Sequence, residues 1–180
     1  MLLFISLLVG LLVSKILLWF GHWAMYQVQW LHDPVYVPST DQATRDMVAL
    51  KSKWEGVRVA DVGSGNGKLV IAFAKEGAIV DGYENKWWLV WNSRRRIAQL
   101  GLNNTAQIKW QNFWQVNFCA YDVVILYTSN HLMAQLERKL WQELQPGAAV
   151  ISNTFQFPHW PLKKQLGNVF LYEKGLPFKT

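Results

Sequence analysis

An apolar strand joined to a helix through three alternate glycines is the feature of this sequence that most limits its fold. The stretch covers residues 57–73, and its glycines are Gly63, Gly65 and Gly67. Glycine adopts positive φ and allows a ligand to approach the backbone closely. A helix predicted to begin near Lys68 would direct unpaired N–H groups toward the same point. The stretch therefore predicts a nucleotide-type cofactor loop at the carboxyl end of the first strand.

The spacing of these glycines separates two classes of cofactor fold. A hydride-transfer dinucleotide fold has the pattern Gly-x-Gly-x-x-Gly, whose third glycine would fall at position 68, but Lys68 stands there. Asp61 ends the strand, where its carboxylate can order the loop amides or meet a cationic ligand. A second predicted strand, residues 78–83, leads to Glu84, which can accept both hydroxyls of a ribose. This set resembles the class I S-adenosylmethionine-dependent methyltransferases; a glycine-rich turn beside two surface acids is the plainer alternative.

The first 26 residues form a separate apolar segment with a single charge, Lys15. The segment is long enough to span a bilayer. It lacks the basic start and small-residue cleavage site of a signal peptide, and it ends in the aromatic side chains Trp19, Phe20, Trp23 and Tyr26, which are typical of a membrane interface. The sequence therefore predicts a retained transmembrane anchor over residues 1–26 and one methyltransferase domain over residues 27–180.

The charges that flank this segment predict its orientation. No lysine or arginine precedes the apolar run, whereas Arg45, Lys51 and Lys53 follow it. By the positive-inside tendency, the catalytic domain of this single-pass protein is expected to face the cytoplasm. The membrane would be the inner membrane of a bacterium or a mitochondrial membrane of a eukaryote.

Predicted helices and strands alternate beyond the second strand. The helices are expected over residues 40–53, 87–100 and 133–143, and the strands over residues 106–110, 121–127, 148–152 and 168–173. Ser39 with Gln42 fits a capping box for the first of these helices. Trp88, Trp91, Ile97 and Ala98 are expected on one apolar face of the second. The alternation favours an α/β fold with a doubly wound, mostly parallel, Rossmann-like sheet.

Several short motifs narrow the resemblance. They are Tyr36-Val37-Pro38-Ser39, residues 61–68, Gly82-Tyr83-Glu84, Trp88-Leu89-Val90 with Ser93-Arg94, Leu136-Glu137 with Lys139-Leu140, and Phe155-x-Phe157-Pro158-x-Trp160. In this combination the chain resembles the membrane-anchored protein-lysine N-methyltransferases, whose eukaryotic members modify mitochondrial carriers and a subunit of the ATP synthase. The likeness covers nearly all of residues 35–173. Lys86-Trp87 departs from it, because Asn-Pro is common there.

The resemblance implies S-adenosyl-L-methionine as the cofactor and a set of residues that bind it. These are Tyr36, Pro38, Ser39, Asp61, Gly63, Ser64, Gly65, Asn66, Gly67, Glu84, Asn112 and Phe113. Residues 36–39 are expected to fold over the methionine end of the cofactor. Asn112 replaces an acidic residue that usually meets the adenine amine, and its side-chain carbonyl can accept the same hydrogen bond.

An acceptor lysine must lose its proton before it can attack a methyl group. Its pKa, about 10.4 in water, falls in an apolar or aromatic channel. Candidate channel residues follow the fourth and fifth strands and are Tyr127, Thr128, Phe155, Phe157 and Trp160. Core packing is the competing interpretation of the aromatic ones. No side chain stands out as a general base, and the spacing of the four histidines and one cysteine predicts no metal site.

The net charge of +6 and the run Ser93-Arg94-Arg95-Arg96 have three explanations. A solvated helix face is the most ordinary, contact with anionic lipid is the next, and nucleic-acid binding is disfavoured because no RNA-binding module is recognisable. The predicted function is methyl transfer from S-adenosylmethionine to a lysine amine of a membrane protein. A membrane lipid or quinone methyltransferase and an inactive scaffold with the cofactor fold are the alternatives.

Overall fold

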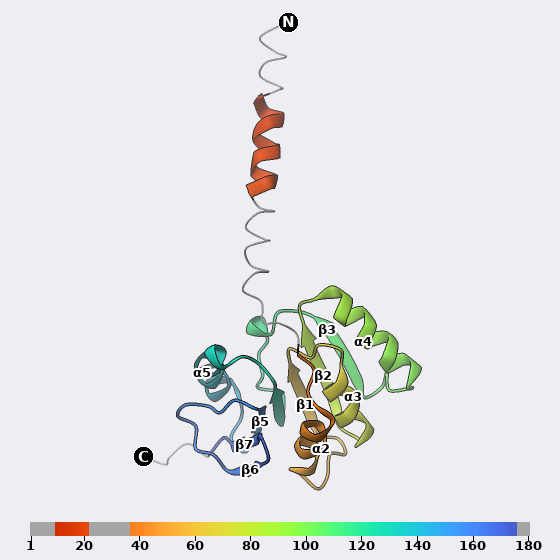
Figure 1. Ribbon diagram of the computed structural model, residues 1–180, viewed down its shortest axis with the longest axis vertical. Coiled ribbons are helices and arrows are strands. Elements are labelled where there is room, and N and C mark those ends of the chain that lie inside the picture. Colours follow the sequence, from red (N-terminus) through yellow and green to blue (C-terminus); the bar gives the residue numbers. More distant parts are fainter. Residues whose placement is uncertain (1–9, 22–36, 176–180) are drawn as a thin grey trace, which may run out of the picture. The chain divides into compact units, whose positions relative to one another are not determined.

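The computed structural model describes residues 10–21 and 37–175 (Figure 1). The chain divides into two compact units, residues 1–35 and 36–180. In the first unit, residues 10–21 are helical and exposed. Within residues 10–21 and 37–175, no helix has both the length and the hydropathy that a membrane span requires. Residues 1–9 and 22–26 of the predicted anchor, and Tyr36 of the predicted cofactor site, lie outside the described residues.

The second unit is built on one seven-stranded sheet with the order β3-β2-β1-β4-β5-β7-β6. Its strands are β1 (Arg58–Val62), β2 (Ile79–Glu84), β3 (Ala106–Trp110), β4 (Val123–Leu126), β5 (Ala149–Asn153), β6 (Lys164–Leu166) and β7 (Val169–Glu173). The first five of these pair in parallel, while β7 is antiparallel to both β5 and β6. The predicted mostly parallel sheet is confirmed. Strands β6 and β7 are antiparallel because a tight hairpin at Gly167, whose φ is +56°, connects them, and so short a connection can only join antiparallel strands.

Helices cover both faces of this sheet. They are α2 (Asp41–Ala49), α3 (Lys68–Lys75), α4 (Trp87–Gln99) and α5 (Met133–Glu143), with short 3₁₀ turns η1 (Phe113–Gln115) and η2 (Asn130–Leu132). Neighbouring strand residues point to opposite faces. Val59 therefore packs with α2, α3 and α4, while Ala60 packs with α5 on the other face. Figure 1 shows α5 across the sheet from α3 and α4. The arrangement is the doubly wound one that the alternation of elements predicts.

The predicted capping box of α2 is wrong. Thr40 is the N-cap, and its side-chain oxygen accepts a hydrogen bond from Ala43 N at 3.1 Å. The Gln42 side chain instead bonds Asp46 within the helix. Ser39 is buried one residue before this N-cap.

The predicted apolar face of α4 is also wrong in part. Leu89, Val90, Ser93 and Ile97 are the buried residues of this helix, whereas Trp88, Trp91 and Ala98 are exposed. The reason lies at the glycine loop, where a Cβ on Gly67 would stand 3.0 Å from Ser93 Cβ. Only a small side chain fits at the point where α4 passes the loop, so the helix turns its tryptophans outward.

Candidate functional site

The candidate site lies at the carboxyl edge of the sheet, around the end of β1. The strand order reverses between β1 and β4, and such a switch point leaves a crevice where ligands bind in open α/β sheets. Asp61 and the glycine loop leave β1 at this edge, and Glu84 ends the neighbouring β2. The residues that the sequence assigned to the cofactor from the first two strands are therefore brought together.

The loop takes the conformation that its glycines allow. Gly63, Gly65 and Gly67 have φ of +74°, +53° and +74°, a region that residues with a Cβ rarely occupy. The amides of Gly63 and Ser64 both donate to the Tyr83 carbonyl, at 3.0 and 2.9 Å. From α4, the buried Ser93 hydroxyl lies 3.0 Å from the Gly65 carbonyl and 2.6 Å from the Leu89 carbonyl of its own helix, so these two acceptors share its single proton. The loop is thus fixed between β2 and α4.

Glu84, rather than Asp61, is the carboxylate that orders the loop amides. Its Oε2 accepts from Gly65 N at 3.0 Å and its Oε1 accepts from Lys86 N at 2.8 Å. The residue is buried. Each carboxylate oxygen has room for a second hydrogen bond, so the predicted contact of Glu84 with ribose hydroxyls is compatible with this role.

Asp61 is a buried acid in need of a partner. The residue is 2% exposed, and its Oδ2 has no hydrogen-bond partner. Burial, together with the nearby charge of Glu84, raises the pKa of Asp61 from 3.8 to about 8. An ionised carboxylate would be stable here only beside a cation or several donors. The geometry therefore fits the second sequence interpretation of Asp61, a contact with a cationic ligand.

Two serine hydroxyls are also buried without a hydrogen-bond partner. The oxygens Ser64 Oγ and Ser129 Oγ are buried and unpaired, and with Asp61 Oδ2 they are the buried side-chain atoms without a partner among the described residues. Ser64 lies in the glycine loop and Ser129 follows β4, across the switch point. Since buried polar groups are nearly always satisfied, these three unpaired oxygens at the carboxyl edge of the sheet leave hydrogen-bonding capacity for a polar ligand. The donors and acceptors suit S-adenosylmethionine, which carries an ammonium, a sulfonium and ribose hydroxyls.

Lys68 connects the loop to the segment before β1. Its Nζ donates to the Ser39 carbonyl at 2.5 Å and pairs with Asp41 at 2.7 Å. The charge and hydrogen bond of Lys68 lower the pKa of the Asp41 carboxyl. The residue that replaces the third glycine of a dinucleotide motif therefore fastens residues 39–41 against the start of α3. Pro38, next to this contact, is exposed.

The predicted adenine-contact residues follow β3. Asn112 is exposed, and its Oδ1 accepts from Trp114 N at 3.0 Å, which caps η1. An amide oxygen accepts two hydrogen bonds, so one remains for a ligand. Phe113 is half-buried and its ring centroid lies 4.9 Å from that of Trp114. The adenine contact of both residues stays a prediction.

The candidate channel residues fall into two groups. Phe157 and Trp160 are core residues: their rings stack at 5.5 Å, and both pack against Tyr172 of β7. Tyr127, Thr128 and Phe155 are half-buried at the ends of β4 and β5. The competing interpretation of core packing thus holds for the first two, and the other three remain candidates for the acceptor channel.

Two residues that sequence reasoning missed follow β5 at the same edge. Asn153 is 4% exposed, and its carbonyl accepts from Phe155 N at 2.9 Å. This tight turn holds Thr154 at φ +71°, the one positive φ outside glycine among the described residues. A β-branched residue in that region costs on the order of 1–3 kcal/mol and often marks a functional site. The only sequence signal is an asparagine at the carboxyl end of a strand.

A groove of about 760 Å³ lies elsewhere. Val57, Val123 and Ala149 line it, and these residues lie at or next to the amino ends of β1, β4 and β5. The groove is therefore at the opposite edge of the sheet from Asp61 and Glu84, and it is not the candidate site.

The family follows from comparison with known proteins. Residues 61–164 match the model of the ANTKMT methyltransferase domain, a stretch that covers more than half of the chain. The chain belongs to this family. Its methyltransferase domain contains the loop, β2, α4 and the segment after β5 described above.

Two relatives of this chain agree with the assignment to this family. The chain is 41% identical over 125 residues to the ATP synthase C-subunit lysine N-methyltransferase of Rattus norvegicus, covering 69% of this chain and 57% of that protein. It is 28% identical over 150 residues to a protein-lysine N-methyltransferase of Saccharolobus islandicus, covering 78% and 93%. The chain thus spans only a little more than half the length of the rat relative.

A solved structure shows the same fold. The crystal structure of an RNA methyltransferase from Salinibacter ruber, in complex with S-adenosyl-L-homocysteine, is 25% identical with a TM-score of 0.72. The match covers 79% of this chain and 98% of that one. The Rossmann-like methyltransferase sheet predicted from the sequence is therefore confirmed.

Proposed function

We propose that this chain binds S-adenosyl-L-methionine at the carboxyl edge of its sheet and transfers the methyl group to a lysine amine of a membrane protein. The observation that carries the cofactor assignment is Asp61, a buried carboxyl with an unpaired oxygen beside the glycine loop. In the bound state its carboxylate would face the cationic methionine end, and Glu84 would face the ribose. Asn112 and Phe113 would hold the adenine.

The reaction asks the chain mainly for positioning. The cofactor, when bound, supplies a methyl group already activated by its sulfonium. The chain must hold an amine in line with that methyl group and keep water away. Tyr127, Thr128 and Phe155 line the proposed approach, since they are half-buried at the same edge. Desolvation there would lower the pKa of the lysine amine and favour its neutral, attacking form.

The lysine acceptor is proposed from the family and its relatives. Both the rat and the Saccharolobus islandicus relatives are named lysine methyltransferases, and the rat protein is named for the C-subunit of the ATP synthase. That polypeptide is therefore the first acceptor to test for this chain. Because the solved structure with the same fold is an RNA methyltransferase, RNA is tested as an acceptor in the same experiment.

The test is a labelling reaction with competing acceptors. Purified full-length chain is incubated with methyl-labelled S-adenosylmethionine and membranes that contain ATP synthase, and then polypeptide, lipid and RNA are separated. We expect the label in a polypeptide, and methylated lysine after hydrolysis. Label confined to lipid, quinone or RNA would replace the lysine acceptor with that one. Cofactor binding without transfer to any fraction would favour the scaffold alternative. Asp61→Asn serves as the control that lacks the cofactor contact.

We further propose that residues 1–26 anchor the protein in a membrane and that residues 27–180 form the catalytic domain on its cytoplasmic side. The apolar composition of the first 26 residues supports the anchor. So do the exposed side chains of Leu11, Leu17, Leu18 and Trp19 in the helical residues 10–21, since a helix with so much exposed apolar surface needs lipid or a partner to cover it. Release of the chain by alkaline carbonate, or a mature N-terminus beyond Tyr26, would contradict this proposal.

A further inference from the structure

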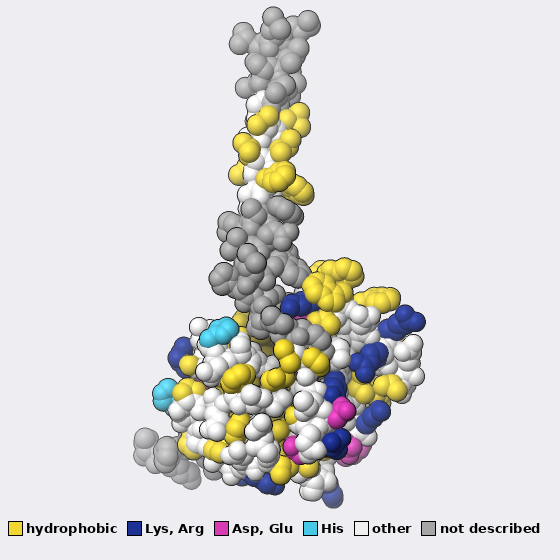
Figure 2. Space-filling model, in the orientation of Figure 1, with side chains coloured by type: hydrophobic (Ala, Val, Ile, Leu, Met, Phe, Trp, Pro, Cys, Tyr) yellow, Lys and Arg dark blue, Asp and Glu magenta, His cyan; other side chains and the backbone are white. Residues whose placement is uncertain are grey.

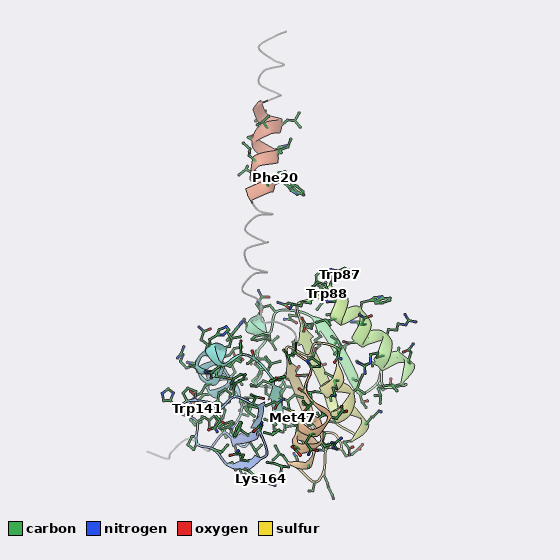
Figure 3. All side chains as sticks on the ribbon, viewed as in Figure 1. Phe20, Met47, Trp87, Trp88, Trp141 and Lys164 are labelled. Carbon is green, nitrogen blue, oxygen red and sulfur yellow. The ribbon has the colours of Figure 1, made fainter. Side chains whose placement is uncertain are left out.

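Four exposed tryptophans lie together at one end of the catalytic unit. They are Trp87, Trp88, Trp91 and Trp110, with 60%, 38%, 59% and 64% of their surface exposed, and we call them the tryptophan face. The first three belong to the start of α4, and Trp110 ends β3. Figure 3 shows Trp87 and Trp88 at the beginning of α4, and Figure 2 shows hydrophobic side chains gathered there.

Helix spacing and two contacts place these residues on one surface. Trp91 lies one turn after Trp87 and Trp88 on α4. Trp110 pairs in register with Glu84 of β2, and its indole N–H donates to the Asn85 carbonyl at 2.8 Å, two residues before Trp87. The rings of Trp87 and Trp88 meet edge to face at 6.1 Å. The tryptophan face therefore lies at the carboxyl ends of β2 and β3, beside the candidate cofactor site.

The charged side chains of α4 all have one sign. Helix α4 contains no acidic residue and carries Arg94, Arg95 and Arg96. The Arg95 guanidinium lies over the Trp91 ring, 5.9 Å from its centroid. Arg94 and Arg96 each donate one hydrogen bond to a backbone carbonyl. A guanidinium has five N–H donors, so all three arginines keep donors for an anionic partner.

The combination matches a lipid surface better than other partners. Indole rings concentrate at the membrane interface because they are apolar with one polar N–H, and arginines attract anionic headgroups. A single-stranded nucleic acid would need flat ring faces for successive bases, whereas Trp87 and Trp88 stand at 89° to each other. We infer that the tryptophan face and the arginines of α4 seat the catalytic unit on an anionic lipid bilayer, with the indoles at the level of the headgroups.

This contact would be separate from the proposed anchor, and it deepens the proposed function. The tryptophan face and Glu84 share one edge of the sheet, so a seated domain would hold its cofactor crevice close to the headgroups. A lysine at the surface of the bilayer would then be within reach. Only this consequence rests on the proposed function, because lipid contact itself needs no methyl transfer.

The test uses a fluorescent probe on the full chain. In a Cys119→Ser background, which removes the single cysteine, Trp91→Cys carries a polarity-sensitive dye. The matched control is Trp141→Cys, because Trp141 is also an exposed tryptophan, at 47%, but belongs to α5 on the other face of the sheet. Both proteins are mixed with phosphatidylcholine vesicles, with and without phosphatidylglycerol, that contain nitroxide-labelled lipid.

We expect the dye at position 91 to shift its emission to shorter wavelength and to be quenched several-fold more than the dye at position 141. The difference should grow with phosphatidylglycerol and shrink with salt. A second probe, on Trp87→Cys, should behave like the first. Equal quenching at positions 91 and 141, or none at 91, would overturn the proposal. A response to single-stranded RNA in place of vesicles would assign the surface to nucleic acid and overturn it too. Since the readout is independent of activity, failure here leaves the proposed reaction standing.

Discussion

Asp61→Asn should make the cofactor-free protein more stable at pH 8 than the natural chain, by a few kcal/mol. The pKa of Asp61 is 3.8 in the unfolded reference and about 8 in the fold. Between these values the folded protein keeps a proton that the unfolded chain has released. The free energy of unfolding therefore falls as pH rises, by about 1.4 kcal/mol per pH unit. Asparagine does not ionise, so the free energy of unfolding of the variant does not fall in this way as pH rises. The gain in stability is reduced by the cost of burying the asparagine amide.

Denaturant unfolding at pH 5 and pH 8 measures this effect. The advantage of Asp61→Asn should be larger at pH 8. Asp122→Asn is the matched control, because Asp122 is exposed at the amino edge of the sheet, where its carboxylate accepts from Arg58 N. That variant should show no comparable growth with pH. A constant difference between Asp61→Asn and the natural chain would contradict the raised pKa.

The same substitution should lower the affinity for S-adenosylmethionine, by about 10- to 100-fold if one charged hydrogen bond is lost. A cationic ligand favours the ionised form of Asp61, so binding at pH 7 should drive a proton from the natural chain. Calorimetry in two buffers of different ionisation enthalpy measures that release. Asp61→Asn should release none. Unchanged affinity, or equal proton release, would refute the assignment of Asp61.

Glu84→Ala should both disorder the glycine loop and lower the affinity for S-adenosylmethionine. The substitution removes the carboxylate that accepts from the amides of Gly65 and Lys86, and leaving the buried Gly65 amide unpaired costs about 1–3 kcal/mol. It also removes the ribose acceptor. We expect reduced thermal stability and an affinity for S-adenosylmethionine at least about tenfold weaker, measured by calorimetry below the unfolding temperature.

Glu137→Ala is the matched control for this loss. Glu137 is as buried as Glu84, at 7% exposure for both, and its carboxylate accepts from the amides of His159 and Trp160. Removing this carboxylate should destabilise the fold without lowering the affinity for S-adenosylmethionine. An equal loss of affinity in both variants would mean that Glu84 acts only through stability.

The strands and most helix ends were predictable because their signals are local. Residues 106–110 and 133–143 agree with β3 and α5, since the apolar residues have the spacing of a strand in the first segment and of a helix in the second. The short β6 has no apolar run and forms only by pairing with β7. The orientation of α4 was not predictable, because its first turn is apolar on every side and the space beside Gly67 decides which residues are buried.

The candidate site was predictable in its location and less so in its detail. Parallel strands bring Asp61 and Glu84 to one edge, which the order of elements alone implies. Which acid binds the loop depends on the distance from Gly65 N to a particular oxygen, and no pattern encodes that. Similarly, Phe157 and Trp160 follow β5 as expected, but their burial depends on Tyr172, which arrives with the antiparallel β7.

Gly82 limits which substitutions this sequence can accept. A Cβ at this position in β2 would lie 2.6 Å from Ile108 Cδ1 and 2.7 Å from Ser64 Cβ. The isoleucine end can rotate away, but Ser64 is held by the bond from its amide to Tyr83 O. A single-step change at position 82 would therefore push the cofactor loop out of place. Descendants of this chain can alter position 82 only along mutational paths in which the loop at Ser64 is rebuilt first.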